Sequence, residues 1–498
     1  MAIDFGSHGF DYTRDLCCAI ERYTADAVQR RPDAFLYREM QLRYAVERRL
    51  YIQCINSEAL FQRYLALSGR GAPSLQYPAL NALESDIAAF LPGLHAPAVR
   101  PARRIGRRLH LVARQVYGWL RSRLRGRRAE GWQSGPGHDI LIHVVNAKFA
   151  TYLSPVTQKL GEGGFAYLAA CDHELGLRMK QSGHPVVNWS AGGASLGSVF
   201  SSWALSEFFQ LMHEADVTLE ALRALRPRCV LVVEGNAPLD VITSEACRLI
   251  GIPCFCMQQG WSPYIHSGFR NMAYTEMFVW GERFAQLLTP HNPDQKFRVT
   301  GSHAVQAEAS LSRGPASSAR TFSFFLQAPC ALLGVAAYAA FVGLIAEVAA
   351  AHPQVEIIVR EHPGYPLPTV LREKLAACPN VRFSNPAAEP LANVISISEM
   401  VVSVFSTVLL EAVAMNVVPL ICSIGAMRRF EPDLASLGAA IEVQSIADAK
   451  RVLDEVIADP ARLESMRTSL PDVARQFFSQ EDAATMIAGR LEQFAARY

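Results

Sequence analysis

The feature that most constrains the fold is an alternation of short apolar strands with helices, which occurs twice along the chain. From His138, segments such as D-I-L-I-H-V-V and R-C-V-L-V-V-E-G-N alternate with helical stretches, the clearest of them at about 239–250. The alternation restarts near Arg320 with T-F-S-F-F-L-Q and V-E-I-I-V-R. Single apolar strands separated by helices indicate a parallel, doubly wound sheet. The sequence therefore predicts two tandem Rossmann-like α/β domains.

The boundaries of these domains follow from local composition. Residues 309–320, A-S-L-S-R-G-P-A-S-S-A-R, have the Ser, Ala, Gly and Pro content of a linker. We therefore expect a first domain over 137–308 and a second over 321–498. Residues 1–136 show apolar residues at helical spacing and predict a helical accessory region. Two such domains would face each other across a cleft between the carboxyl ends of both sheets, where ligands are expected.

The net charge of +2 hides one strongly basic segment. Arg100–Arg128 holds eleven arginines and no acid, and the rest of the chain has 37 basic against 46 acidic residues. Arginine alternates there with Leu, Val, Tyr and Trp, as in helices that lie on anionic membranes. A solvated surface helix and a nucleic-acid contact are the alternatives. Because the remainder is acidic, we expect an anionic membrane surface as the partner and no nucleic acid.

The uncharged stretch Ala328–Ala346 approaches the length of a membrane span, about 20 residues. It is rich in Ala and Gly and lies between two strand-like segments, so we expect a buried helix instead. The N-terminus has no basic segment followed by an apolar one, and the eleven cysteines include no C-x-x-C pair. These features predict a protein of the reducing cytoplasm.

Candidate ligand-binding groups follow two strands of the second domain. In V-R-E-H-P-G-Y-P, His362 and Pro363 come directly after a strand, and Arg360 can add charge. An imidazole at that edge can donate to a phosphate oxygen or protonate a leaving group. In S-V-F-S-T-V-L-L-E, Ser406 and Thr407 open a helix, where backbone N–H groups and hydroxyls can bind an anion. A structural turn and simple helix capping are the alternatives at these two places.

One turn into the same helix lies Glu411, which is placed to reach a ribose or to cap locally. In the first domain, Gln258, Gln259 and Gly260 follow a strand and are expected to face the same cleft. His266, in the loop after them, is a candidate acid or base.

Two carboxylates of the first domain are candidates for the chemistry. Glu234 ends a strand and Asp240 begins the next helix, and a carboxylate at a strand end can act as nucleophile or general base. Gly235 lets the chain turn, and Asn236 can hydrogen-bond the acid. We favour Glu234, because the helix dipole is expected to lower the basicity of Asp240.

The ordered set G-I-P-x-x-x-x-Q-x-G, W-G, V-T-G, a linker, H-P and S-T-x-x-x-E-A resembles the bacterial surface-polysaccharide glycosyltransferases of the GT-B fold. It is most similar to the Kdo transferases of capsule and O-antigen synthesis, and less so to polysialyltransferases and CDP-glycerol glycerophosphotransferases. The resemblance covers roughly residues 138–480. It implies that His362, Pro363, Ser406 and Thr407 bind the phosphate of a cytidine nucleotide. Gln259 stands where that family has a histidine.

The resemblance implies a transferase that moves an acidic, Kdo-like sugar from a CMP-activated donor to a surface polysaccharide or lipid-linked glycan at the inner face of the cytoplasmic membrane. No D-x-D motif stands out, so we expect no metal and no cofactor beyond the nucleotide sugar. The leaving phosphate would then be stabilised by His362, the hydroxyls and the helix start. A nucleotide-sugar epimerase of GT-B fold and a catalytically inactive scaffold in polysaccharide assembly remain alternatives.

Overall fold

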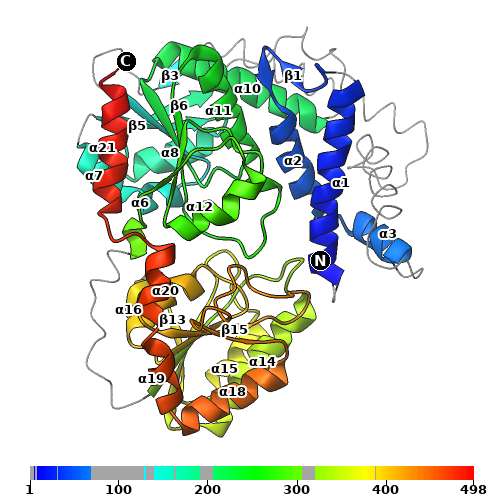
Figure 1. Ribbon diagram of the computed structural model, residues 1–498, viewed down its shortest axis with the longest axis vertical. Helices are drawn as coiled ribbons and strands as arrows, with labels where there is room; N and C mark the ends of the chain where they lie inside the picture. Colours follow the sequence, from blue (N-terminus) through cyan, green and yellow to red (C-terminus); the bar gives the residue numbers. More distant parts are fainter. Residues whose placement is uncertain are drawn as a thin grey trace.

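In the computed structural model the chain forms two α/β lobes and a helical N-terminal region beside the first lobe (Figure 1). The structure describes residues 5, 8–30, 32–55, 57–68, 128–130, 139–161, 164–190, 206–305, 320–386 and 388–497. Apart from Arg128 and Arg320, the predicted basic segment and the predicted linker lie outside these residues.

The first lobe contains an eight-stranded sheet in the order β10-β9-β8-β7-β4-β5-β6-β3. Seven strands are parallel and the edge strand β3 is antiparallel, so this part of the predicted accessory region belongs to the sheet. The strands are β3 (Arg128–Glu130), β4 (Ile140–His143), β5 (Phe165–Ala170), β6 (Val186–Ser190), β7 (Cys229–Val233), β8 (Cys254–Met257), β9 (Glu276–Val279) and β10 (Phe297–Val299).

Both faces of this sheet are buried. Successive side chains of a strand point to opposite faces, so alternate residues belong to different apolar clusters. Leu141 packs in one apolar cluster and its neighbours Ile140 and Ile142 in another. The helices of this lobe are α6 (Lys148–Tyr152), α7 (Ser154–Leu160), α8 (His173–Gln181), α10 (Ser206–Leu225), α11 (Pro238–Ile250) and α12 (Glu282–Leu288), with 3-10 turns η2 (Ser267–Phe269) and η3 (Thr289–His291).

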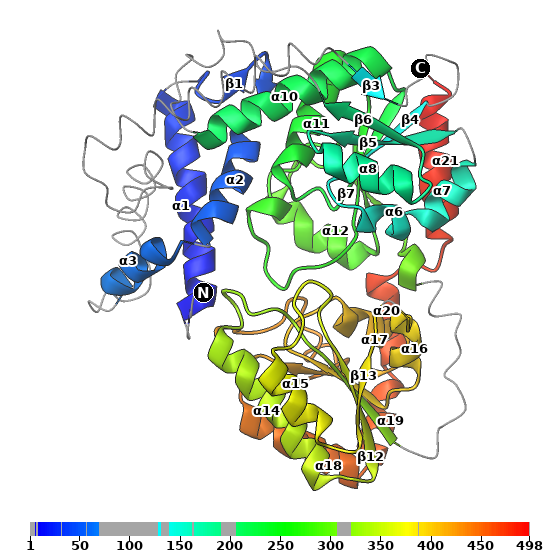
Figure 2. The ribbon, with the colours of Figure 1, turned by 180° about the vertical axis from the view of Figure 1, so that it is seen from behind.

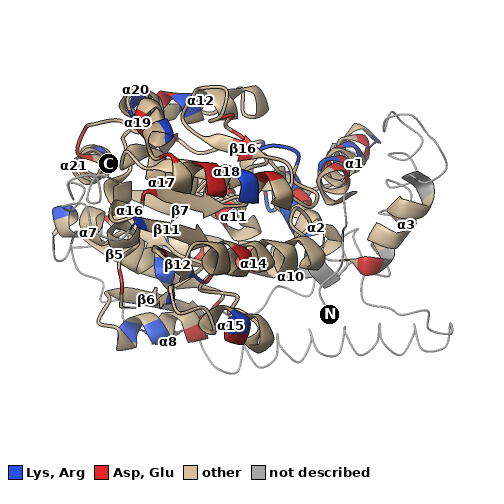
Figure 3. Ribbon diagram, turned by 90° about the horizontal axis from the view of Figure 1, so that it is seen from below, with Lys and Arg blue, Asp and Glu red and all other residues tan. Residues whose placement is uncertain are grey.

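The second lobe contains a six-stranded, fully parallel sheet in the order β13-β12-β11-β14-β15-β16. Its strands are β11 (Arg320–Phe325), β12 (Val355–Arg360), β13 (Val381–Ser384), β14 (Met400–Ser403), β15 (Val418–Cys422) and β16 (Ile441–Val443). Its helices are α14 (Val335–Ala351), α15 (Thr369–Ala376), α16 (Leu391–Ser396), α17 (Val408–Ala414), α18 (Ile446–Ala458), α19 (Ala461–Arg467) and α20 (Leu470–Phe477). Lys, Arg, Asp and Glu are intermixed on its outer helices, for example along α18 (Figure 3).

The uncharged stretch Ala328–Ala346 forms no membrane span. No helix in the described part of the chain is long and apolar enough to cross a bilayer. Residues 328–334 form a loop, and α14 starts at Val335, between the paired strands β11 and β12 as expected. Phe341, Val342 and Ile345 are buried against the sheet, whereas the exposed side holds several alanines together with Val335 and Glu347.

The N-terminal region consists of α1 (Gly9–Arg30), β1 (Leu36–Tyr37), β2 (Met40–Gln41), α2 (Arg43–Ile55) and α3 (Glu58–Ser68). Seen from behind, α1 and α2 lie beside α10 of the first lobe (Figure 2). Tyr12, Leu16 and Phe35 are fully buried and belong to the same apolar cluster as the sheet residues. The region is therefore built into the first lobe.

The last helix, α21 (Ala483–Ala495), returns to the first lobe and runs along it (Figure 1). Ile487 and Leu491 are buried against the first sheet, and Arg490 pairs with Glu276 of β9. The sequence places all of 321–498 in the second domain, so the domain boundary differs for this helix. The apolar stripe of α21 shows that it covers a sheet, but not which of the two sheets.

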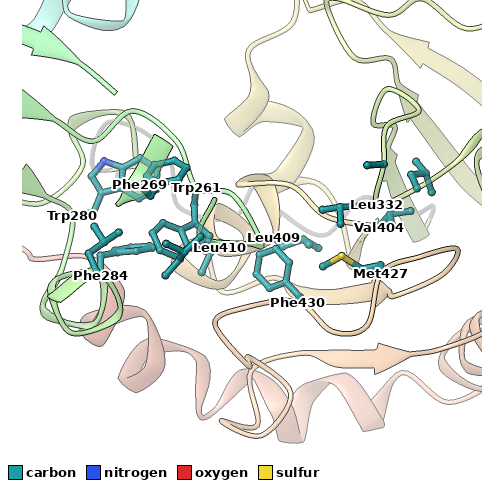
Figure 4. Close-up of a cluster of buried hydrophobic side chains, with 14 of the residues drawn as sticks. Trp261, Phe269, Trp280, Phe284, Leu332, Val404, Leu409, Leu410, Met427 and Phe430 are labelled. Carbon is teal, nitrogen blue, oxygen red and sulfur yellow. The ribbon is translucent and has the colours of Figure 1, made fainter. Parts of the chain in front are cut away.

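An apolar contact joins the two lobes (Figure 4). Trp261 and Phe284 of the first lobe have ring centroids 4.9 Å apart. They lie beside Leu409 and Leu410 of α17 and near Phe430. The indole Nε1 of Trp261 also donates to the carbonyl oxygen of Glu431 (2.6 Å). These contacts fix the carboxyl edge of one sheet against that of the other.

Candidate active site between the two sheets

The strained turn after β7 presents Glu234. This residue has φ +72°, which is uncommon for a residue with a side chain, and Gly235 follows with φ +71°. A Cβ atom at Gly235 would lie 2.5 Å from Cys256 Sγ, so only glycine fits. The turn is held by the hydroxyl of Tyr274, which donates to the Gly235 carbonyl oxygen (3.0 Å). The predicted turn at Gly235 is confirmed.

Burial raises the pKa of the Glu234 carboxyl, while the nearby ammonium of Lys148 and a hydrogen bond with Asn236 lower it. Lys148 begins α6 directly after β4, and its side chain is exposed. The Glu234 carboxylate is partly desolvated, lies near the positive charge of an ammonium group and has one amide as hydrogen-bond partner. It can act as a base or nucleophile. Lys148 is not among the residues predicted from the sequence, although its place after a parallel strand puts it at the same edge as Glu234.

Glu234 faces the second lobe across Gly260. A Cβ atom at Gly260 would lie 4.0 Å from Glu234 Oε1 and 3.6 Å from Thr407 Oγ1. The amide of Trp261 donates to Thr407 Oγ1 (3.0 Å), and the Thr407 hydroxyl reaches the Trp261 carbonyl oxygen (3.4 Å). Thr407 thus lies where the two edges meet, and its hydroxyl connects the lobes.

The two glutamines after β8 differ in their placement. Gln258 is buried, and its Oε1 accepts from the Trp280 amide (3.1 Å). Its carbonyl oxygen accepts from the hydroxyl of Tyr152 and from the indole of Trp280, both at 3.1 Å. The hydrogen bonds of Gln258 therefore connect the end of β8 with Trp280 and Tyr152, and its side chain does not face a cleft. Gln259 is half-buried beside it.

In the second lobe, His362 follows β12, and its Nδ1 accepts from the Gly364 amide (3.1 Å). In the neutral ring Nε2 therefore carries the proton and can donate to an anion. Burial, and then the charge of Lys148 from the first lobe, lower the pKa of His362. Lys148 is thus close to both Glu234 and His362. Pro363 is exposed in the turn between His362 and Tyr365.

Three further candidates of the second lobe have partners within the lobe or at its contact with the first lobe. Arg360 donates to Ser384 Oγ (2.9 Å) and to the Glu389 carbonyl oxygen (2.8 Å), so its guanidinium is used within the lobe. Ser406 Oγ accepts from the Val408 amide (3.3 Å) in the turn before α17, whose N-cap residue is Thr407. Burial, and to a smaller extent the charge of Glu411 of α17, raise the pKa of Tyr152 in the first lobe, which places this carboxylate at the contact between the lobes.

Asp240 lies in the first turn of α11, as expected, but its basicity is the reverse of the expectation. Burial raises the pKa of its carboxyl to about 7, although Oδ2 accepts from the Ala237 amide (3.0 Å) and Arg48 provides a positive charge. Asp240 is only 1% exposed. Loss of hydration disfavours the charged form by more than the helix dipole favours it. Asp240 is therefore enclosed beneath the edge that Glu234 occupies.

His266 lies next to this edge, on a cavity beside the N-terminal helices, since a Cβ atom at Gly268 would be 2.7 Å from its ring and 2.9 Å from Asn236 Cβ. Its Nδ1 accepts from the Gly268 amide (3.0 Å), and burial lowers its pKa to about 4. Arg48 of α2, almost fully buried, adds to that lowering and donates to the Gly268 carbonyl oxygen (3.1 Å). A neutral imidazole of this kind can donate a hydrogen bond but is a weak base at neutral pH.

The described residues include no group of three or more His, Cys, Asp or Glu that could hold a metal ion. All eleven cysteine thiols are unpaired, and most are buried. The candidate groups at the site between the sheets are the carboxylate of Glu234, the ammonium of Lys148, the imidazole of His362 and the hydroxyls of Ser406 and Thr407. The independence of metal ions stays a prediction.

No protein-family model and no curated protein matches the chain. Among solved structures, it is similar to a UDP-GlcNAc 2-epimerase from Neisseria meningitidis bound to UDP-GlcNAc, with 14% identity over 72% of this chain and 100% of that chain and a TM-score of 0.50. It is also similar to the S. aureus MnaA–UDP co-structure, with 12% identity over 72% and 97% of the two chains and a TM-score of 0.50.

These similarities concern the fold, which is the GT-B fold of two facing Rossmann-like domains. The predicted fold class, including the helical N-terminal extension, is confirmed.

Proposed function

We propose that this protein is a glycosyltransferase that uses a nucleotide-sugar donor. The observation that carries the proposal is the approach of Glu234 and Thr407 to the same glycine, because it sets a basic group of one lobe against the ligand-binding edge of the other. Ligands of open α/β sheets bind at the carboxyl ends of the strands. His362, with a free Nε2 donor, and Lys148 supply groups for a phosphate at that place.

In this proposal the second lobe binds the nucleotide and the first lobe carries the reacting group. Glu234 takes a proton from the acceptor hydroxyl or attacks the sugar carbon, and the departing phosphate oxygen accepts hydrogen bonds from His362 and Lys148. The finer proposal, from the sequence motifs, is a CMP-linked acidic sugar of the Kdo type. The acceptor is then a surface polysaccharide or lipid-linked glycan.

A second candidate is a nucleotide-sugar epimerase. Two observations favour it: the GT-B structures compared above are named as an epimerase or hold UDP, and two carboxylates with raised pKa, Glu234 and Asp240, lie near each other. A UDP-GlcNAc 2-epimerase interconverts UDP-GlcNAc and its epimer at C2 without an acceptor. A transferase releases the nucleotide in an acceptor-dependent reaction.

A thermal-shift series with CMP, CDP, UDP and GDP tests the donor. A ligand that binds the folded form raises the melting temperature by mass action. We expect CMP or CDP to raise it by a few degrees and UDP and GDP to raise it less. A preference for UDP contradicts the CMP assignment, and UDP-GlcNAc epimerisation without acceptor supports the second candidate. No shift with any nucleotide contradicts both.

We also propose that Arg100–Arg128 attaches the enzyme to the inner face of the cytoplasmic membrane. Each basic group near an anionic surface contributes about 1 kcal/mol, and salt screens that attraction. Binding to liposomes with anionic lipid should fall with added salt and with Arg→Gln changes in the segment. Salt-independent binding, or none, contradicts this assignment.

A further inference from the structure

A cavity of about 460 Å³ lies where the N-terminal helices meet both lobes. Its walls include Thr13 of α1, Tyr51 of α2, the loop 262–266 after β8 and Phe405 after β14. The volume falls within the range of small-molecule sites, roughly 300–1,000 Å³. Thr13 and Tyr51 belong to α1 and α2, so the N-terminal region supplies part of the cavity wall.

The described residues that line the cavity include no Asp, Glu, Lys or Arg. Their aromatic side chains include Tyr51, Tyr264, His266 and Phe405. The imidazole of His266 is stacked on the Tyr51 ring, with centroids 5.1 Å apart and an angle of 3° between the planes. A charged ligand would lose its hydration there, and none of the described lining residues carries a charge that replaces it; the charges that act on His266 are those of Arg48 and Arg270, which are not among these lining residues. The cavity therefore favours a neutral ligand with a flat apolar face.

The same lining also carries polar groups. The hydroxyl of Tyr264 is buried and has no hydrogen-bond partner among the described residues. Ser262 adds a hydroxyl, and His266 adds an Nε2 donor because its Nδ1 is already an acceptor. The Thr13 hydroxyl, in contrast, already donates to the Gly9 carbonyl oxygen (2.7 Å). A hydrocarbon chain would leave the Tyr264 hydroxyl and the His266 Nε2 unsatisfied, which costs free energy. A sugar ring satisfies both demands, since it has an apolar C–H face and a rim of hydroxyls.

The cavity adjoins the site between the sheets. A Cβ atom at Gly268, next to His266, would lie 2.9 Å from Asn236 Cβ, and Asn236 hydrogen-bonds Glu234. On the other side, Phe405 directly precedes Ser406. We propose that this cavity binds an uncharged sugar ring and is the acceptor subsite; the word acceptor rests on the function proposed above. The N-terminal helices thereby select the neutral end of a glycan.

Ligand-observed NMR on the full chain without nucleotide tests the chemistry of the cavity. The probes are methyl β-D-glucopyranoside, methyl β-D-galactopyranoside, methyl β-D-glucuronide and 1-octanol. We expect at least one of the two neutral glycosides to bind at millimolar concentration, and the glucuronide and octanol to bind at least tenfold more weakly. Absence of binding by both neutral glycosides overturns the proposal, as does equal or stronger binding of the glucuronide or octanol.

Three variants locate the binding. Ser262→Trp fills the cavity from its loop and should weaken the glycoside at least tenfold. Tyr264→Phe removes only the hydroxyl and should weaken it about threefold, the loss of one hydrogen bond. Ser465→Trp, on the exposed side of α19, is the control and should bind as the wild type does. Wild-type binding by folded Ser262→Trp overturns the proposal. Because no nucleotide is used, a failed nucleotide shift contradicts the transferase without affecting this result.

Discussion

The two sheets share the same order over six parallel strands but carry different chemistry at their carboxyl edges. On the first sheet, burial raises the pKa of two carboxyls, Glu234 and Asp240. On the second sheet, the carboxyl edge holds an imidazole, His362, and two hydroxyls, Ser406 and Thr407. The strands determine where these side chains stand, and the residue that follows each strand determines what it can do.

This difference is the basis of the task that we propose for each lobe. A carboxyl whose pKa is raised towards neutrality can exchange protons at physiological pH, whereas an imidazole N–H and hydroxyls donate hydrogen bonds to an anion. Lys148 belongs to the first lobe but acts on both edges, since it lowers the pKa of Glu234 and of His362. The following experiments separate chemistry on the first edge from binding on the second.

The largest effect is expected for Glu234→Gln. Removing the charge while keeping the shape should lower turnover about 100-fold or more, because the base or nucleophile is lost. Nucleotide affinity should remain close to wild type, since the nucleotide is assigned to the other lobe. Acceptor-dependent nucleotide release and calorimetry measure the two quantities. Glu282→Gln, exposed on α12, is the control. An active Glu234→Gln together with an inactive Asp240→Asn would transfer the role to Asp240.

His362→Ala should weaken nucleotide binding, which Glu234→Gln should leave close to wild type. Loss of a hydrogen bond to a charged phosphate, about 1.5–3 kcal/mol, corresponds to roughly 10- to 100-fold weaker nucleotide binding. The fold should be retained, because His362 is at a turn and only half-buried. His352→Ala, in the same lobe but paired with Asp454, serves as control for nucleotide affinity. Unchanged affinity and turnover in His362→Ala would remove this residue from the site.

A smaller effect, on pH dependence, is expected for Lys148→Met. A positive charge favours the ionised carboxylate, so its removal raises the pKa of Glu234. If ionised Glu234 is required, the acidic limb of the kcat/KM profile moves to higher pH in the variant. Lys159→Met, which removes an exposed ammonium on the neighbouring helix α7, should leave the profile in place. A shift to lower pH contradicts the assignment of Lys148.

The smallest effect concerns the attachment of α21 to the first lobe. Hydrogen bonds and ion pairs with Arg490 and Arg298 outweigh burial and lower the pKa of Glu276 to about 2. A lowered pKa stabilises the fold above the usual carboxyl pKa of about 4.5, and this stability is lost as the pH falls towards 2. Glu276→Gln should therefore cost about 1 kcal/mol at pH 7, after allowance for solvent screening, and less near pH 2.

Denaturant melts at the two pH values measure this difference. Glu347→Gln, exposed on α14 of the second lobe, is the control. An equal loss of stability at both pH values would show that the glutamine disturbs packing rather than charge.

Much of the fold could be read from the sequence because parallel strands buried on both faces leave a direct signal. The runs that became β4, β7, β8, β11 and β12 are short, apolar and bounded by polar residues, and each was predicted. β5, F-A-Y-L-A-A, and β16, I-E-V, were not predicted, because small or charged residues weaken that signal. Parallel strands of one sheet end at the same edge. The sequence therefore also predicted that Glu234, Gln258 and His362 lie at the two edges that face each other.

The sequence by itself determined the two sheets, the turn at Gly235 and the chemical types available at each edge, because these depend on local patterns of apolar residues and glycine. Only the tertiary structure decided which side chains are used where. The raised pKa of Asp240, the enclosure of Gln258 and the engagement of Arg360 depend on burial and on partners distant in sequence. The return of α21 and the cavity beside α1 and α2 depend on the same long-range packing. Local patterns do not encode how much water a side chain loses when remote segments close over it.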